Sequence, residues 1–326
     1  MKIVLAFALI ISSAVSAVVD PSGGRIRYRF VDPKVPVKVF YDSVSPIENG
    51  SLCHRAVILI HGWGGHVRKI LPVFNDALAA RASGAEPVPY VIAPMFPRRK
   101  TLAGNKGGPD DDRAVWNDSW DSSALHKIGS AADDWRGGGD ANGTTFSSYD
   151  FIDRILDRMC DTNLFPRLKR IVIAGFSAGG QFSGRYAAIG KGAVREGVEL
   201  VYIDMAPSTE FRFDKDEPWH YGLKGRPRYG SGLTDEDIMR NLCSRRVWRG
   251  CGDMDTKGRP HTSLDMTPPA VRQGSNRLER FRNFEKYLDA YPEWKKQTSF
   301  HVFKGIGHNE VLAYPTKEVL DFVFGE

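Results

Sequence analysis

Residues 170–180 read RIVIAGFSAGG, in which an apolar run leads into a serine flanked by glycines. The run from Arg170 to Ala174 is apolar almost throughout, which is typical of a strand covered on both faces. A glycine-serine-glycine string centred on Ser177 follows, and a helical pattern begins at Ala178. This context predicts a sharp strand-to-helix turn that exposes the Ser177 hydroxyl at the edge of a sheet, and it disfavours an ordinary glycine-rich turn.

Similar apolar runs recur along the chain, at residues 56–60, 90–93, 199–203 and 299–303, with a shorter one at Val247 and Trp248. Residues 25–31 and 35–41 instead alternate between apolar and polar, as expected of an opening antiparallel pair. Helical patterns lie between the runs: one capped by Ser148 and reaching Met159, one after Ser177, one at about 277–288 and one at 316–324. Strands alternating with helices predict an α/β fold with a doubly wound, mostly parallel central sheet.

Two long stretches fit this alternation poorly, at about 98–147 and 207–243. Both are rich in charges and carry tryptophans, and loops of this length in a compact domain usually have a function. We interpret them as insertions over the strand ends of a single domain spanning residues 18–326. The alternative interpretation, that their tryptophans fill a small accessory core, is equally consistent with the sequence.

Serine needs a base to attack, and the base needs an acid to orient it. His308 lies in Gly305-Ile306-Gly307-His308-Asn309, directly after the last predicted strand, where a tight loop can bring the imidazole to Ser177. The acid is expected in the turn after the strand at Val247. We favour Asp255 over Asp253 there, and Asp204 at the end of an earlier strand is a more remote alternative.

Residues 61–65, His-Gly-Trp-Gly-Gly, follow the strand at 56–60. Three glycines let backbone amides approach a negatively charged oxygen without obstruction by side chains. In this strand order the loop supplies one donor of an oxyanion hole, and the residue after the serine supplies the other. The expected donors are the amides of Trp63 and Ala178, with the Gly64 amide as the alternative to Trp63.

Together, the 61–65 loop, the Ser177 turn, the aspartate turn and His308 resemble the α/β-hydrolase superfamily. Further strings resemble a group of extracellular eukaryotic hydrolase-like proteins, namely Ser147-Ser148-Tyr149-Asp150, Phe165-Pro166-Arg167-Leu168 and Ala178-Gly179-Gly180-Gln181 leading to Arg185-Tyr186-Ala187. The resemblance implies a triad of Ser177, Asp255 and His308, with Trp63 and Ala178 as oxyanion donors. It implies no particular substrate. Cys251, just before the aspartate turn, departs from the pattern.

The N-terminus predicts export. Lys2 precedes an apolar run at residues 3–11 and a small-residue stretch ending in Val15-Ser16-Ala17, which together match a secretory signal peptide cleaved after Ala17. The run is too short to span a bilayer, so we expect no stable membrane span. Asn49, Asn117 and Asn142 each begin an Asn-X-Ser/Thr triplet, the acceptor pattern for N-glycosylation.

Four cysteines, at 53, 160, 243 and 251, lack the spacing of metal ligands. In an oxidising compartment they suggest two disulfides, for which we favour Cys243–Cys251 and Cys53–Cys160. Free buried thiols are the alternative.

The net charge of +6 comes from scattered basic residues without a nucleic-acid motif, so we expect no nucleic-acid partner. No cofactor or metal is expected, because the sequence has no HExxH, paired CxxC, Walker A or suitably placed GxGxxG motif. Asp110-Asp111-Asp112 lacks the glutamate of a calcium loop. The sequence thus predicts a secreted serine hydrolase acting on an ester, or an amide or thioester, of a small molecule or polymer. A secreted binding protein without turnover and an acyltransferase are the alternative functions.

Overall fold

The computed structural model describes residues 17–18, 26–65, 67–84, 86–98, 113–117, 134–257 and 263–326. The first 16 residues of the expected signal peptide lie outside this part of the chain. So do the acidic run at 110–112, Trp120 and much of the expected insertion at 98–147. None of the described helices combines the length and apolarity needed to cross a bilayer.

A nine-stranded sheet forms the centre of the described chain, in the order β1-β2-β3-β5-β4-β6-β7-β8-β9. Its strands are β1 Ala17–Val18, β2 Ile26–Phe30, β3 Val39–Ser43, β4 Arg55–Ile60, β5 Tyr90–Pro94, β6 Arg170–Phe176, β7 Glu199–Met205, β8 Val247–Gly252 and β9 Thr298–Phe303. Six neighbouring strands are parallel, namely β5, β4, β6, β7, β8 and β9. Strands β1, β2 and β3 add an antiparallel edge. The predicted mostly parallel sheet and its opening antiparallel pair are therefore confirmed.

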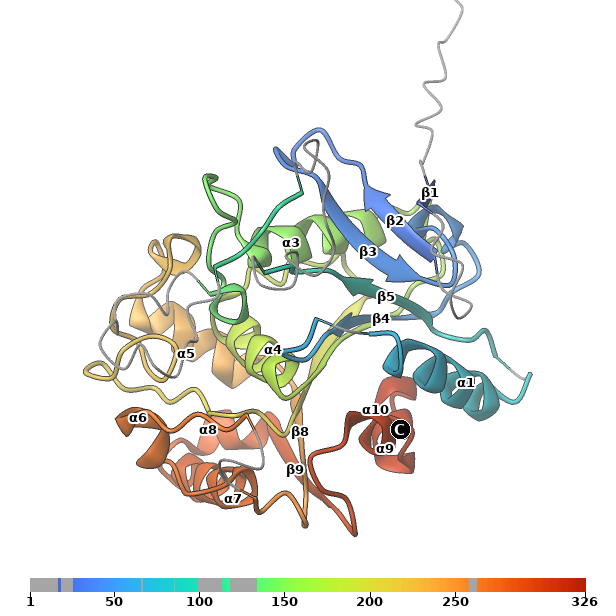
Figure 1. Ribbon diagram of the computed structural model, residues 1–326. Coiled ribbons are helices and arrows are strands. Elements are labelled where there is room, and N and C mark those ends of the chain that lie inside the picture. The colour runs from blue at the N-terminus through green and yellow to red at the C-terminus, as the bar shows by residue number, and fades with distance from the viewer. Residues whose placement is uncertain are drawn as a thin grey trace, which may run out of the picture.

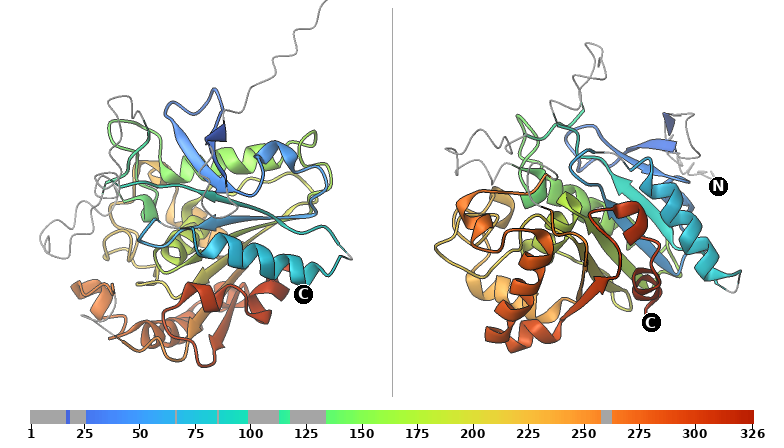
Figure 2. Two further views of the ribbon diagram at one scale, coloured as in Figure 1. Left: turned by 45° about the vertical axis from the view of Figure 1, so that its right-hand side comes forward. Right: turned by 60° about the horizontal axis from the view of Figure 1, so that its bottom comes forward.

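Helices cover both faces of the sheet (Figures 1 and 2). They are α1 Ile70–Ala82, α3 Ser148–Met159, α4 Ala178–Ile189, α5 Asp235–Ser244, α6 Pro268–Val271, α7 Arg277–Tyr287, α8 Pro292–Lys296, α9 Glu310–Ala313 and α10 Lys317–Phe324. Alternate residues of one strand serve two cores: Ile58 packs with residues of α3 and α4, while Val57 packs with residues of α1 and α10. Strands that are apolar on both faces require this arrangement, because each face must be covered.

Two helices differ from what the sequence predicts: one begins at another residue, and the other was not predicted. Ser147, rather than Ser148, caps α3. Its hydroxyl accepts a hydrogen bond from the Asp150 amide, and the Asp150 carboxylate accepts one from the Ser147 amide, which together form a capping box. Helix α5 lies at the end of the stretch interpreted as an irregular insertion at 207–243. Thr234 and Asp237 form its capping box, and Ile238 and Leu242 are buried on its inner side.

The tryptophans that the structure describes in the two long stretches belong to the core. Trp116, Trp135 and Trp219 have no more than 1% of their surface exposed, and Phe96 stacks on Trp135 with ring centroids 5.3 Å apart. Two of the indole groups are also tied to the backbone: Trp116 donates to Gly139 O and Trp219 donates to Gly137 O. Of the two interpretations, these described tryptophans favour the one in which the side chains fill a core.

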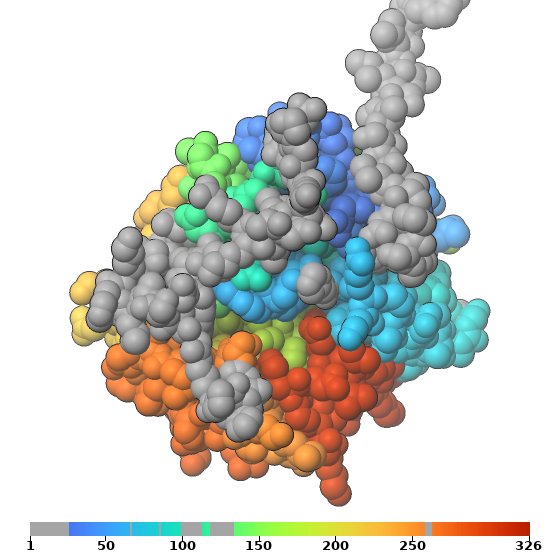
Figure 3. Space-filling view, in the orientation of Figure 1, coloured from blue at the N-terminus to red at the C-terminus, as the bar shows by residue number. Residues whose placement is uncertain are grey.

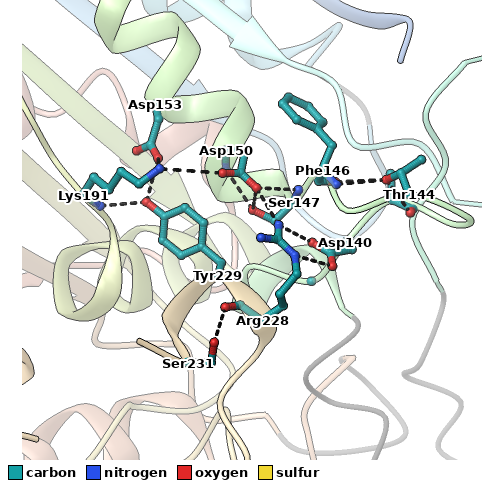
Figure 4. A network of polar contacts seen from close by, with 12 residues as sticks. Asp140, Thr144, Phe146, Ser147, Asp150, Asp153, Lys191, Arg228, Tyr229 and Ser231 are labelled. Atoms are coloured by element: carbon teal, nitrogen blue, oxygen red, sulfur yellow. Dashed lines mark hydrogen bonds and ion pairs between the residues drawn. The ribbon is translucent and has the colours of Figure 1, made fainter. Parts of the chain in front are cut away.

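A polar network fastens the 207–234 region to α3 (Figure 4). Arg228 pairs with Asp140 at 2.8 Å and with Asp150, in the first turn of α3, also at 2.8 Å. One helical turn on, the buried carboxylate of Asp153 accepts hydrogen bonds from the Tyr186 and Tyr229 hydroxyls. The carboxylates of α3 thus bind side chains of α4 and of residues 228–229, and they hold this part of the 207–234 region against the rest of the protein.

All four cysteines are free thiols, so the expected disulfides are wrong. Cys243 packs against the core on one side of the sheet, whereas Cys251 is fully buried in the core on the other side. Cys160 lies at the end of α3, where its sulfur accepts a hydrogen bond from the Arg195 amide. Short spacing in sequence therefore does not bring Cys243 to Cys251, because the two side chains belong to cores on opposite faces of the sheet.

We expect reducing agents to leave the melting temperature unchanged, because no cross-link is lost on reduction. Thiol titration should count four thiols in the denatured protein without reductant. Cys251 should react only after unfolding, since none of its surface is exposed. A count of two or fewer, rising to four on reduction, would contradict the structure.

Candidate active site

Ser177 stands between β6 and α4 with φ 58° and ψ −115°, a backbone conformation that L-residues rarely adopt. The two glycines of the motif make this turn sterically feasible. A Cβ at Gly175 would lie 2.0 Å from the Gly179 carbonyl oxygen, and one at Gly179 would lie 2.3 Å from the Ile60 oxygen. The motif therefore packs α4 directly against β4 and β6 and lifts the serine out of the sheet edge.

His308 lies between the serine and an aspartate. Its Nε2 is 3.0 Å from the Ser177 Oγ, and its Nδ1 is 2.7 Å from the Asp255 Oδ2. The Phe176 ring packs against the imidazole with centroids 4.8 Å apart. Ser177 and Asp255 lie 131 and 53 positions before His308 in the sequence, and the fold brings the three side chains into one continuous chain of hydrogen bonds.

The other candidate aspartates have different partners. Asp253 Oδ1 accepts a hydrogen bond from the Gly305 amide at 2.8 Å, so this residue shapes the turn that leads to His308. Asp204 is buried beneath α4, where it pairs with Arg249 at 2.7 Å. Burial raises the pKa of Asp204 to about 7, and the Arg249 guanidinium opposes that rise. Of the three candidates, Asp255 is the one that contacts His308.

The turn after β8, which carries Asp255, and the loop after β9, which carries His308, contact each other through their backbones. The amides of Asp253 and Met254 donate to the oxygens of Phe303 and Ile306, at 2.9 and 3.0 Å. A Cβ at Gly252 would lie 1.9 Å from the Ile306 oxygen, which explains the glycine at the end of β8. This packing fixes the separation of the two loops that carry Asp255 and His308.

The expected oxyanion donors lie at the same edge of the sheet. Trp63 is in the turn after β4, and Ala178 is the first residue of α4, next to the end of the adjacent parallel strand β6. First-turn helix amides have no partner within the helix, so they are available to an anion. The structure brings these two turns side by side, with Gly179 packed on Ile60.

Several residues that sequence reasoning missed surround Trp63. The guanidinium groups of Arg98 and Arg136 lie 3.8 and 4.8 Å from the centroid of its ring. The buried Arg136 also pairs with Asp134 and donates to the Gln181 side chain on α4. His61 accepts a hydrogen bond from the Phe96 amide at 3.1 Å, which anchors the 61–65 loop to the residues after β5. No local pattern marks the contacts with Trp63, Gln181 and Phe96, because each joins residues distant in sequence.

Glu310, at the start of α9, lies against the 61–65 loop at Gly62. Its Oε2 would lie 3.4 Å from a Cβ at Gly62, and burial raises the pKa of its carboxyl group. In the space-filling view, the red surface of the C-terminal segment accordingly meets the blue surface of the segment that follows β4 (Figure 3). Within the described ranges, no group of three or more His, Cys, Asp or Glu side chains is arranged to hold a metal ion.

No protein-family model and no curated protein sequence matches the chain. The fold of the chain does match solved structures. A poly(3-hydroxybutyrate) depolymerase, LpqC, from Bordetella parapertussis is 18% identical with a TM-score of 0.62, over 93% of this chain and 90% of that one. Poly(aspartic acid) hydrolase-1 from Sphingomonas sp. KT-1 is 19% identical with a TM-score of 0.62, over 93% and 99%. An S-formylglutathione hydrolase from Agrobacterium tumefaciens is 12% identical with a TM-score of 0.50, over 95% and 96%.

At these identities the likeness concerns the fold. Sheet order, the strand-to-helix turn at Ser177 and these neighbours agree on it: the chain has the α/β-hydrolase fold. The fold prediction made from the sequence is confirmed.

Proposed function

We propose that the protein is a serine hydrolase that cleaves a carboxylic ester through an acyl-enzyme on Ser177. The observation that carries the proposal is the unbroken hydrogen-bonded chain from the Ser177 Oγ through His308 to the buried Asp255. A hydroxyl alone is barely ionised at neutral pH, and this chain supplies the base and its orienting acid. That solved neighbours include a poly(3-hydroxybutyrate) depolymerase and an S-formylglutathione hydrolase adds support from the fold.

In the first step, His308 Nε2 takes the Ser177 proton while Oγ bonds to the acyl carbon. The amides of Trp63 and Ala178 stabilise the oxyanion that forms. His308 then gives its proton to the leaving alcohol, and the carbon–oxygen bond of the ester breaks. In the second step, water loses a proton to His308 and attacks the acyl-enzyme, which releases the acid and restores the serine. Asp255 keeps the Nδ1–H of His308 directed toward itself and stabilises the imidazolium.

The place of action is also a proposal. The basic start, the short apolar run and the small residues ending at Ala17 support export, and residues 18–326 would then form one mature domain. Asn49 and Asn117 are exposed, as glycan acceptors must be. The resemblance to extracellular eukaryotic hydrolase-like proteins, noted from the sequence, points the same way.

The test is a panel of acyl esters of graded chain length, with matched amides and thioesters, assayed with the wild-type protein and Ser177→Ala. We expect ester hydrolysis by the wild type and none above background by the variant. If folded wild-type protein cleaves no ester, a binding protein on this fold becomes the better account. Added acceptor alcohols distinguish hydrolysis from acyl transfer, because a transferase would give the new ester in place of the acid.

The pH profile follows from the state of His308. Burial lowers the pKa of this imidazole below its ordinary value of 6.5, the hydrogen bond to Asp255 opposes the change, and the Arg277 guanidinium favours it. His308 accepts a proton only when neutral, that is, above its pKa. The acid limb of kcat/KM should therefore have its midpoint below pH 6.5. A midpoint clearly above that value contradicts the assignment of His308 as the base.

A further inference from the structure

Arg277 lies against the oxygen of Asp255 that His308 does not use. Its Nη1 is 3.8 Å from the Asp255 Oδ1, and neither side chain has more than 1% of its surface exposed. Oδ2 is taken by His308, and Oδ1 accepts no hydrogen bond from the described residues. The carboxylate is thus held between an imidazole and a guanidinium.

Helix α7 places this guanidinium. Arg277 is its first residue, and the Nη2 donates to the Ser263 oxygen at 3.2 Å. The next residue, Leu278, donates its amide to the Asp255 backbone oxygen at 3.3 Å. The first turn of α7 therefore contacts both the main chain and the side chain of Asp255. Burying a carboxylate without a compensating charge costs several kcal/mol, and Arg277 provides that charge.

We propose that Arg277 is a positioning residue that fixes the Asp255 carboxylate against His308 Nδ1, a role that rests on the proposed function of Ser177, His308 and Asp255. Neither the superfamily motifs in the sequence nor the local pattern around residue 277 indicates it. Arg277 does not reach the serine and acts through Asp255.

The charge of Arg277 also bears on the imidazole. Three kinds of group face His308: the Asp255 carboxylate from the turn after β8, the Arg277 guanidinium from α7, and the Ser177 hydroxyl from the turn before α4. Two more titratable groups belong to this region. The buried Cys251 thiol on β8 interacts electrostatically with Asp255 and Arg277, and Glu310 follows His308 by two positions in sequence; burial raises the pKa of each. Because the Arg277 cation lowers the pKa of His308, its removal raises that pKa.

The first test replaces Arg277 with methionine, which keeps bulk and removes the charge. We expect kcat/KM to fall about 100-fold, because Asp255 keeps its hydrogen bond to His308 but is held less precisely in line. The acid limb of kcat/KM should also move toward higher pH, because the cation that lowers the pKa of His308 is gone. Arg280→Met is the matched control: Arg280 is equally buried on α7 but donates to the oxygens of Gly274, Ser208 and Asp265. It should lower stability without moving the acid limb.

Arg277→Lys and Arg277→Gln provide a second pair should the methionine variant fail to fold. Lysine keeps the charge and should keep the acid limb near its wild-type position, whereas glutamine should move it as methionine does. In a double-mutant cycle, Arg277→Gln should cost much less activity in an Asp255→Asn background than in the wild type. Equal losses in the two backgrounds would mean that Arg277 does not act through Asp255.

A readout independent of turnover separates this inference from the proposed function. The NMR titration of His308, assigned by its absence in His308→Gln, should shift to higher pH in Arg277→Gln and stay near the wild-type midpoint in Arg277→Lys. If the wild type cleaves no ester and the titration still shifts, the proposed function fails while the contact stands. An unchanged titration together with full kcat/KM in Arg277→Gln overturns the proposal.

Discussion

His308→Ala is expected to lower kcat/KM for an ester substrate by about 10⁴-fold or more, because no other described base contacts the Ser177 hydroxyl. Ser177→Ala should cause a loss of the same order. The double variant should be no slower than the worse single one, since serine and base act as a unit. Steady-state kinetics on purified proteins, with tight control of contaminating esterases, provide the measurement.

The His308 side chain is 19% exposed, so we expect the fold to survive its truncation. Circular dichroism and the melting temperature of each variant should stay close to those of the wild type. A folded His308→Ala protein that keeps more than about a tenth of wild-type kcat/KM would show that another group takes the proton.

Gly179→Ala should destabilise the protein by about 3 kcal/mol or more, an unusually large effect for one methyl group. The added Cβ would lie 2.3 Å from the Ile60 oxygen and 3.0 Å from that of His61. Both are backbone atoms, so α4 must move away from β4 to make room. That shift would also displace Ser177 and the amide of Ala178, and activity should fall in whatever fraction remains folded.

Gly232→Ala is the matched control for this change. Nothing lies within 4 Å of a Cβ built at Gly232, and its backbone is not in the left-handed region. Its free energy of unfolding should change by no more than about 0.5 kcal/mol. Denaturant unfolding of the two variants measures the difference directly, and equal stabilities would mean that the close packing of α4 on β4 is wrong.

The sheet was predictable because its strands are covered on both faces. A run such as residues 171–174 is apolar throughout, and a short run of this kind ending in a glycine turn is typical of a buried parallel strand. Helix α3 was equally clear from its single apolar stripe. Helix α1 was missed, because it lacks a capping side chain and the alanines at 77, 79 and 80 blur its buried face. Helix α5 was hidden in a charged stretch whose two buried residues are too few to stand out.

The meeting of Ser177, Asp255 and His308 could be inferred because each follows a strand, and parallel strands end at one edge of the sheet. The partners of these residues could not. Arg277 contacts Asp255 from a helix that begins 22 positions later in the sequence, and Arg136 contacts Trp63 from 73 positions later. Such contacts depend on how side chains of separate elements pack, which no local period records. The expected Cys243–Cys251 disulfide is wrong for the same reason: nearness in sequence says little about the face of the sheet on which a thiol lies. The Cys53–Cys160 pair was expected only because these two cysteines remained.

The central claim is that Ser177 is a nucleophile activated by His308, and covalent labelling tests it most directly. A fluorophosphonate probe should add one label per folded molecule, mapped by mass spectrometry of peptides to Ser177 and absent from Ser177→Ala. Labelling should slow strongly in His308→Ala. Folded wild-type protein that takes no label, or a label mapped to another residue, would contradict the account.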